Sequence, residues 1–275
     1  MLSKKHRFAL LVALATLGAP LAAQAQRKSP LADAPAIRKR FELRSARFEL
    51  GAGAGTTINQ DFYHTVTFNF KGSLHIVDWL SIGGFFGIGV AQVATGFEDR
   101  LVTSLATDPA MKGNVNREPL QDSAKAGLQQ IPWVAAVQAE FTPFTGKYSL
   151  FGKLFAAYDF YAFVGPGFIN VKPTGAVRSC DTDASNLAAD DPTRYVCGIS
   201  GVKIGPTFGV GLHSFFGQSV ALGVELRDLM AQLNPSGRDV NGDLRADKND
   251  VSWTHTYMIM GNLLVYLPFT AKISP

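Results

Sequence analysis

Cysteine and long hydrophobic runs are both scarce in this sequence. The 275 residues include two cysteines, and neither lies near residue 25, which argues against a lipoprotein. After residue 25, no apolar stretch reaches the ~20 residues that a membrane-spanning helix needs. No repeat with a solenoid period is present. These absences disfavour a lipid anchor, a helical membrane bundle and a repeat array, and a single domain accounts for the rest of the chain.

The N-terminus has the pattern of a cleaved secretory signal peptide over residues 1–25. A basic segment at 4–7 precedes an apolar segment at 8–17, and Ala23-Gln24-Ala25 forms a small-residue cleavage box. A permanent anchor helix is the alternative, but the apolar segment is short for a membrane span. We therefore expect an exported protein whose mature chain begins at Gln26.

The positive charge of the chain is concentrated near its N-terminus. From Phe41 onward, 18 basic residues stand against 21 acidic ones, although the whole chain has 26 and 22. A nucleic-acid partner is therefore not expected. Residues 26–40 hold five basic residues together with Pro30 and Pro35, and this composition predicts a basic, flexible periplasmic tether.

Apolar residues alternate with small or polar residues through most of the remaining chain. In 219–227, Val220, Leu222, Val224 and Leu226 share one face, and the opposite face holds serine, alanine, glycine, glutamate and arginine. Period-two alternation predicts β-strands. A soluble β-sandwich could show the same alternation, but its water-facing side would not need so much glycine. A narrow barrel lumen accepts small residues and paired charges, while its outer face meets lipid.

We predict eight strands from this alternation: 44–58, 61–75, 79–95, 131–144, 148–169, 197–214, 218–232 and 251–267. Connections at Ile76–Trp79, Pro143–Lys147 and Phe215–Gln218 are short, whereas 97–130, 170–196 and 233–250 are long. Bacterial barrels have short periplasmic turns and long outer loops. The expected fold is all-β: a single antiparallel up-and-down transmembrane β-barrel of about eight strands over 41–269, with a C-terminal tail at 270–275. Ten strands stay open as an alternative.

Two sets of residues follow from this topology. Aromatic residues near strand ends are expected in the interfacial girdles: Phe62, Tyr63, Trp79, Trp133, Tyr148, Trp253, Tyr257, Tyr266 and Phe269. Charged residues on the polar faces are expected to form a lumen network: Arg47, Lys71, Lys153, Lys203 and Arg227 against Glu49, Glu140, Asp159 and Glu225. The signs nearly balance, as buried charges require.

Cys180 and Cys197 are expected to form a disulfide, because an exported protein meets an oxidising periplasm. Closing this loop would contribute about 3 kcal/mol in the chain-entropy model.

An acidic stretch in 239–250 has part of the spacing of a calcium loop. Asp239, Asn241, Asp243 and Asp247 supply side-chain oxygen atoms at relative positions 1, 3, 5 and 9. The glycine falls at position 4 rather than 6, position 12 is Asp250 rather than glutamate, and no flanking helices are expected. Weak calcium binding outside the cell is one hypothesis, and a solvated acidic loop is the other. No further cofactor is expected.

The sequence resembles an outer-membrane β-barrel family of myxobacteria and related deltaproteobacteria. The resemblance is carried by Glu140-Phe-Thr-Pro-Phe-Thr-Gly-Lys-Tyr-Ser-Leu-Phe-Gly152, Ala157-Tyr-Asp-Phe-Tyr161, Gly165-Pro-Gly167, Val224-Glu-Leu-Arg-Asp228 and the Asn59–His64 hairpin. It covers most of 41–269 and implies a fold and a location, but no catalytic residues. Members are generally of unassigned function, and some relatives belong to envelope machines such as gliding motility. Here the sequence ends in Pro268–Pro275 rather than directly on the terminal aromatic residue common in barrels, and Phe269 would take the place of that residue.

The sequence leaves three classes of function open. We expect a non-enzymatic barrel in the outer membrane of a Gram-negative bacterium, in contact with outer-membrane lipid and with envelope proteins through its long extracellular loops. A narrow pore is the first alternative, although eight strands leave a lumen that side chains can fill. A lipid-modifying enzyme is the second, with His64 or His255 near Ser252 or Asp61 at the outer rim, but no motif fixes such a site.

Overall fold

The computed structural model describes residues 42–105, 120–150, 154–188, 191–268 and 272–273. The predicted signal peptide and tether lie outside the described residues, as do Lys153, Phe269 and most of the predicted tail. Within the tail, the described Lys272–Ile273 forms strand β10, which pairs with strand β1 at Glu42–Leu43. This small two-stranded sheet is separate from the main sheet.

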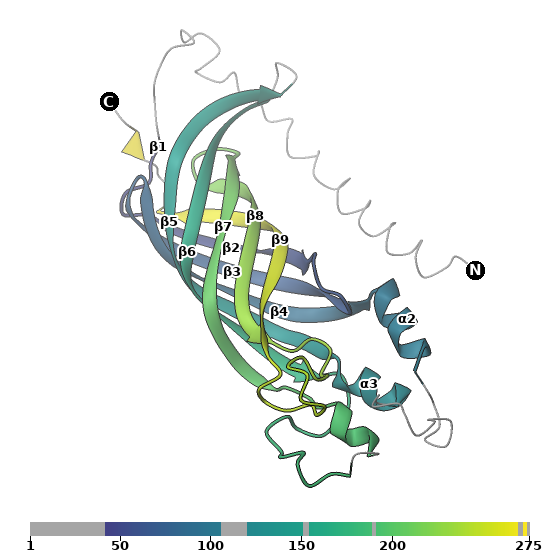
Figure 1. Ribbon diagram of the computed structural model, residues 1–275. Coiled ribbons are helices and arrows are strands. Elements are labelled where there is room, and N and C mark those ends of the chain that lie inside the picture. Colours follow the sequence, from purple (N-terminus) through teal and green to yellow (C-terminus); the bar gives the residue numbers. More distant parts are fainter. Residues whose placement is uncertain (1–41, 106–119, 151–153, 189–190, 269–271, 274–275) are drawn as a thin grey trace, which may run out of the picture. The chain divides into compact units, whose positions relative to one another are not determined.

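The main sheet is a closed antiparallel barrel, in which each strand pairs with the next and the last pairs with the first (Figure 1). The barrel strands are β2 (Phe48–Thr57), β3 (Tyr63–Val77), β4 (Leu80–Ala94), β5 (Gln129–Leu150), β6 (Leu154–Pro173), β7 (Gly201–Phe215), β8 (Val220–Leu233) and β9 (Ser252–Leu267). The predicted up-and-down topology and the strand number of eight are confirmed.

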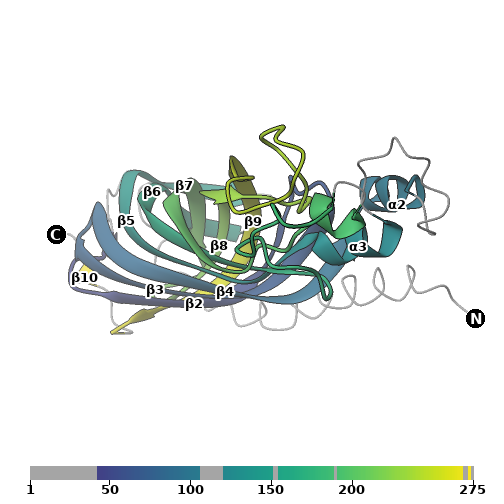
Figure 2. The ribbon, with the colours of Figure 1, turned by 60° about the horizontal axis from the view of Figure 1, so that its bottom comes forward.

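Long connections gather at one end of this barrel, as predicted. Helices α2 (Gly96–Thr103) and α3 (Gln121–Gly127) follow β4, and the 3-10 helix η3 (Pro192–Tyr195) lies between β6 and β7. Figure 1 and Figure 2 show these elements at the same end as the β8–β9 loop. Among the described residues, no helix is both long and apolar enough to cross a membrane.

The predicted turn at Pro143–Lys147 is wrong, because these residues lie inside β5. A register shift between Phe141 and Phe144 places Pro143 in an irregular part of the β5–β6 ladder, where its missing N–H is tolerated. Strand β4 pairs with β5 only as far as Phe141, so the rest of β5 pairs with β6 alone. The hairpin therefore extends beyond the barrel at the short-turn end, as Figure 1 shows.

The outer face of the barrel is a belt of exposed apolar side chains. The members predicted from alternation include Phe68, Phe70, Ile82, Phe86, Phe208, Val210, Leu222, Val224 and Leu226. Trp79, just before β4, and Trp253, at the start of β9, lie at opposite ends of the barrel and are more than half exposed. In water such a continuous apolar surface would drive association, whereas hydrocarbon suits it.

The inner face holds the small and polar residues, with one departure from prediction. Tyr266 was expected in the interfacial girdle but is fully buried inside the barrel. Its position alternates with the outward Val265 and Leu267, so the pleat turns it inward. Phe62 also leaves the girdle, because it is buried beneath the outer helices with Val102 and Leu128. Proximity to a strand end therefore did not determine which face an aromatic residue occupies.

The belt, the closed ladder and the polar interior together place this chain in the outer membrane. A bilayer contains no water to satisfy an open sheet edge, so only helices and closed barrels can span it. The short turns then face the periplasm and the long loops face outward. Figure 1 shows the short turns at one end of the barrel and the long loops at the other.

Candidate functional site

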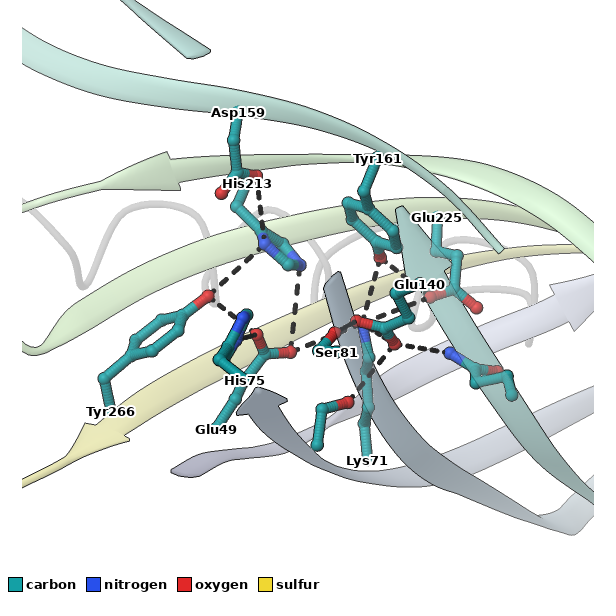
Figure 3. Close-up of polar contacts among 12 residues, drawn as sticks. Glu49, Lys71, His75, Ser81, Glu140, Asp159, Tyr161, His213, Glu225 and Tyr266 are labelled. Atoms are coloured by element: carbon teal, nitrogen blue, oxygen red, sulfur yellow. Dashed lines mark hydrogen bonds and ion pairs between the residues drawn. The ribbon is translucent and has the colours of Figure 1, made fainter. Parts of the chain in front are cut away.

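The lumen contains a charged network centred on Lys71 of β3 (Figure 3). Its Nζ lies 2.9 Å from Glu140 Oε1, 3.3 Å from Glu49 Oε1 and 3.7 Å from Glu225 Oε2. These carboxylates come from β5, β2 and β8, so one ammonium group joins opposite walls of the barrel. It also donates to the Tyr161 hydroxyl at 3.3 Å and lies over that ring. Ser73 and Gln138 donate to Glu140 Oε1, and Ser81 donates to its Oε2.

A second layer lies closer to the periplasmic end and contains two histidines. His75 Nε2 is 3.2 Å from Glu49 Oε2, and Tyr266 donates to the same oxygen at 2.8 Å. His213 Nδ1 is 3.1 Å from Asp159 Oδ1, and its Nε2 is 3.9 Å from Glu49 Oε1. Figure 3 shows His213 between the two carboxylates. This layer therefore links β2, β3, β6, β7 and β9 through polar contacts.

Arginines close the network at both of its ends. Towards the outside, the Arg227 guanidinium lies between the rings of Phe85 and Phe163, at 4.2 and 4.3 Å from their centroids. It also donates to Glu225 at 2.7 Å and to the Gln138 side chain at 2.5 Å. Towards the periplasm, Arg44 pairs with Asp159 and lies over the Phe215 ring. Cation–π contacts and ion pairs together replace the water that these guanidinium groups lose.

Six predicted lumen charges belong to this network: Glu49, Lys71, Glu140, Asp159, Glu225 and Arg227. Arg47 lies at the periplasmic mouth, where it donates to the carbonyl oxygens of Gln218 and Pro268. Lys203 is only half-buried and takes no part in the network among the described residues, because it lies near the outer end of β7. Lys153 lies outside the described residues.

The predicted charge network left out several members, chiefly Arg44, His75, His213 and Tyr266. The period-two alternation does place His75 and His213 on the inward faces of their strands, so the sequence contained enough information to predict that they face the lumen. Arg44 precedes the first barrel strand, so alternation could not place it. Which inward groups meet across the lumen depends on the stagger of the strands, which the sequence does not state.

The outer end of the lumen is apolar and runs into the outer loops. Leu229, Met258 and Met260 of the barrel pack in one cluster with Cys180, Cys197 and Ala246 from the loops. The predicted disulfide joins Cys180 to Cys197. The bond closes the β6–β7 loop on itself, and because both cysteines are buried in this cluster, their packing holds the loop against the barrel core. We call the described parts of these two loops, residues 174–188, 191–200 and 234–251, the outer cap.

Polar contacts join the two loops of the outer cap. Cys197 N donates to the Gly237 carbonyl at 2.8 Å, and Ala246 N donates to the Arg194 carbonyl at 2.9 Å. Arg178 adds bonds to the carbonyls of Thr182 and Ala246. Hydrogen bonds from the Ser185 N–H and hydroxyl hold the pKa of Asp183 below its usual value. The cap is therefore a built structure with many fixed backbone groups.

The acidic stretch of the cap uses its oxygens within the loop. Asp239 accepts from Gly242 N and Leu244 N, Asn241 from Asp243 N, Asp243 from Arg245 N, and Asp247 from Asn249 N. Among the described residues, no three acidic, histidine or cysteine side chains gather as ligands of a metal ion would. Calcium binding stays a prediction, and it would require several of these turns to open.

An acid–histidine pair does occur at the outer rim. His255 Nδ1 lies 2.6 Å from the buried Asp228 Oδ2, and the imidazole stacks on Tyr257. The sequence suggested Ser252 or Asp61 as neighbours instead. Among the described residues, neither of these is hydrogen-bonded to the His255 imidazole. Asp228 and His255 share the outward face with Tyr257, so this pair lies at the lipid interface and apart from the lumen network.

Comparison with known proteins adds little to this geometry. No family model and no curated protein matches the chain. The N-terminal β-barrel domain of OprF from Pseudomonas aeruginosa is 8% identical, with a TM-score of 0.42 over 81% of this chain and 98% of that chain. Ail from Yersinia pestis is 12% identical, with a TM-score of 0.37 over 81% of this chain and 99% of that chain. OprG from P. aeruginosa is 10% identical, with a TM-score of 0.38 over 81% of this chain and 96% of that chain. The resemblance to the myxobacterial family stays a prediction.

Proposed function

We propose that this protein is a non-enzymatic outer-membrane barrel that serves the cell envelope as a structural or interaction module and meets its partners through the outer cap. The observation that carries the proposal is the construction of that cap. The Cys180–Cys197 disulfide closes its β6–β7 loop, backbone hydrogen bonds join this loop to the β8–β9 loop, and both loops share an apolar cluster with the barrel. Rigid loops lose little conformational entropy on binding, which favours recognition.

A narrow pore for small solutes or ions is the alternative. The contacts of Lys71 with three carboxylates cross the lumen at one level, and Arg227 fills it between two aromatic rings at the next. Above them, Leu229, Met258 and Met260 are buried. Free diffusion through this interior would need several ion pairs to break, which is costly in a low-dielectric site.

A lipid-modifying enzyme is less well supported. The Asp228–His255 pair supplies an acid and a possible base near the lipid interface. A hydrolytic site also needs a nucleophile and a group that stabilises the oxyanion in defined positions. Among the described residues, no serine or threonine hydroxyl bonds to the His255 imidazole, so the pair alone does not make such a site.

Photo-crosslinking from the cell surface tests the proposal. A photoreactive residue is placed at Lys248 or Asp181, which are exposed on the two loops of the outer cap, and at the lipid-facing Leu222 as the control. The proposal predicts discrete protein adducts from the cap positions and none from Leu222. Absence of cap adducts in intact cells would contradict it.

Single-channel recording of the purified protein tests the pore. We expect no stable open conductance in planar bilayers. A stable large conductance would replace the proposed interaction role with transport, and it would show that the lumen contacts give way under voltage. Unchanged membrane lipids after His255→Ala would count against the enzyme.

A further inference from the structure

A pocket of about 410 Å³ lies at the outer end of the protein, apart from the lumen network. Phe62, Phe97 and Leu101 supply one wall, Tyr195 the second, and Ser236, Arg238, Asp239 and Leu244 the third. The volume falls within the ~300–1,000 Å³ that is usual for small-ligand sites. The pocket therefore combines an aromatic and aliphatic lining with two charged side chains.

Each wall of the pocket is fixed by its own backbone contacts. The first wall is fixed where Thr95 N donates to the Phe62 carbonyl and Thr95 caps helix α2 through Glu98 N. The second is held by Cys197, two residues after Tyr195, through the disulfide. A bond from Cys197 N to Gly237 O then ties the second wall to the third. A pocket built in this way is formed before any ligand arrives, which lowers the entropic cost of binding.

Apolar side chains of this pocket stay in contact with water in the free protein. Phe97 of helix α2 is 50% exposed and Leu244 of the β8–β9 loop is 43% exposed, although both lie outside the lipid-facing belt. Phe62, by contrast, is buried and contacts the Phe97 ring at a centroid distance of 5.7 Å. An apolar or aromatic ligand body that covers Phe97 and Leu244 would remove this surface from water. Each Å² of apolar surface buried in this way stabilises the complex by about 25 cal/mol.

The two charged side chains of the pocket differ in what they already contact. Both carboxylate oxygens of Asp239 accept backbone N–H groups, from Gly242 at 2.6 Å and Leu244 at 2.8 Å. The Arg238 guanidinium has no hydrogen-bond or ion-pair partner among the described residues, and only the backbone of Arg238 is bonded, to Ser236 and Asn234. The charged group of the pocket that is still available to pair with a ligand is therefore the positively charged guanidinium of Arg238.

We propose that this pocket binds a small organic anion with an apolar or aromatic body, whose carboxylate pairs with Arg238. The planar guanidinium can meet a carboxylate with two parallel hydrogen bonds, while Phe97, Leu244 and Tyr195 cover the apolar body. This inference deepens the proposed function, because it gives the outer loops a ligand class. It does not require a protein partner.

Binding is tested with the full-length mature protein in lipid nanodiscs, which avoids detergent in the pocket. The probe is N-acetyl-phenylalanine, and the matched uncharged probe is its primary amide. Calorimetric titration of the acid is expected to give a dissociation constant of about millimolar or tighter for a ligand of this size. Arg238→Gln is expected to weaken binding of the acid about ten- to a hundred-fold and to leave the amide unchanged.

Two further variants separate the pocket from general charge effects. Lys248→Gln removes one exposed positive charge from the same loop and is expected to leave binding of the acid unchanged. Phe97→Ala is expected to weaken the acid and the amide alike. Equal binding of both probes to the wild type, tighter binding of the cationic phenylalaninamide, or no binding of any probe would each overturn the proposal.

The outcome is independent of the crosslinking experiment. Anion binding without protein adducts would keep the pocket and remove the partner-based function. Adducts without anion binding would do the reverse.

Discussion

The Lys71 ammonium group lies 2.9 Å from the Glu140 carboxylate, with both side chains almost completely buried inside the barrel. The two residues come from β3 and β5, and the contact crosses the interior rather than following a ladder between paired strands. Two more carboxylates lie within 4 Å of the same nitrogen. Lys71 is therefore the common partner of three buried acids.

Replacing Lys71 with methionine is expected to destabilise the barrel strongly. The change keeps most of the side-chain length but leaves Glu49, Glu140 and Glu225 without their shared cation. Removing one partner of a buried pair costs about 3–5 kcal/mol. Urea unfolding in lipid vesicles, followed by tryptophan fluorescence, measures the free energy of unfolding.

Lys203→Met is the matched control, because Lys203 is half-buried and lies outside the network. We expect it to change the free energy of unfolding by less than about 1 kcal/mol. The double variant Lys71→Met with Glu140→Gln should be less destabilised than the sum of its single changes, because the two groups interact. Equal losses for Lys71→Met and Lys203→Met would contradict the central role of Lys71.

Glycines in the strands separate into two kinds that a substitution can tell apart. A Cβ at Gly165 of β6 would run into the Val137 carbonyl oxygen, whereas a Cβ at Gly261 of β9 would meet nothing within 4 Å. Gly165→Ala is thus expected to cost about 1–3 kcal/mol through forced backbone movement. Gly261→Ala should be neutral or slightly stabilising, since alanine loses less backbone freedom on folding. Equal unfolding midpoints for the two variants would refute the distinction.

Strand alternation was enough to predict the barrel and its two faces. Val224 and Leu226 face outward while Glu225 and Arg227 face inward, as the period-two pattern requires. The β5–β6 turn was misplaced because Pro143 and Gly146 are typical turn residues, yet here they lie within a strand. Local propensity could not reveal that β5 extends past its neighbour β4.

Contacts across the lumen were beyond the reach of sequence for a different reason. His213 meets Asp159 on the adjacent strand, but it also meets Glu49, which is distant in sequence and on another wall. Such contacts depend on the stagger of the strands and the diameter of the barrel, which are set only when the sheet closes. The pocket around Arg238 has the same origin, because it joins four connections between strands that no single motif links.

Loss of the disulfide is expected to loosen the outer cap and leave the barrel intact. In the chain-entropy model, a loop with a sequence separation of 17 contributes about 3 kcal/mol. Cys180→Ser with Cys197→Ser should therefore increase amide hydrogen exchange in 174–200, with little change at β8 residues such as Leu226. Unchanged exchange in this loop would show that Arg178 and the backbone contacts hold the cap without the disulfide.

A charge on the lipid-facing belt is expected to cost far more than the same charge on the outer cap. Val224 is 54% exposed on the outer face of β8, and Val240 is 53% exposed in the β8–β9 loop. Their similar exposure makes them a comparable pair, one in a strand that faces lipid and the other in a loop that faces water. Val224→Arg should destabilise the barrel by about 2–4 kcal/mol if it lies near the bilayer midplane.

Val240→Arg should change the free energy of unfolding by less than about 0.5 kcal/mol, as a substitution on a water-facing surface does. Unfolding of both variants in lipid vesicles gives the comparison directly. Folding in a thicker bilayer should preserve the order of the two costs, because Val224 stays within the hydrocarbon. Equal costs at the two positions would mean that the Val224 face is in contact with water, and the membrane assignment of that face would then be wrong.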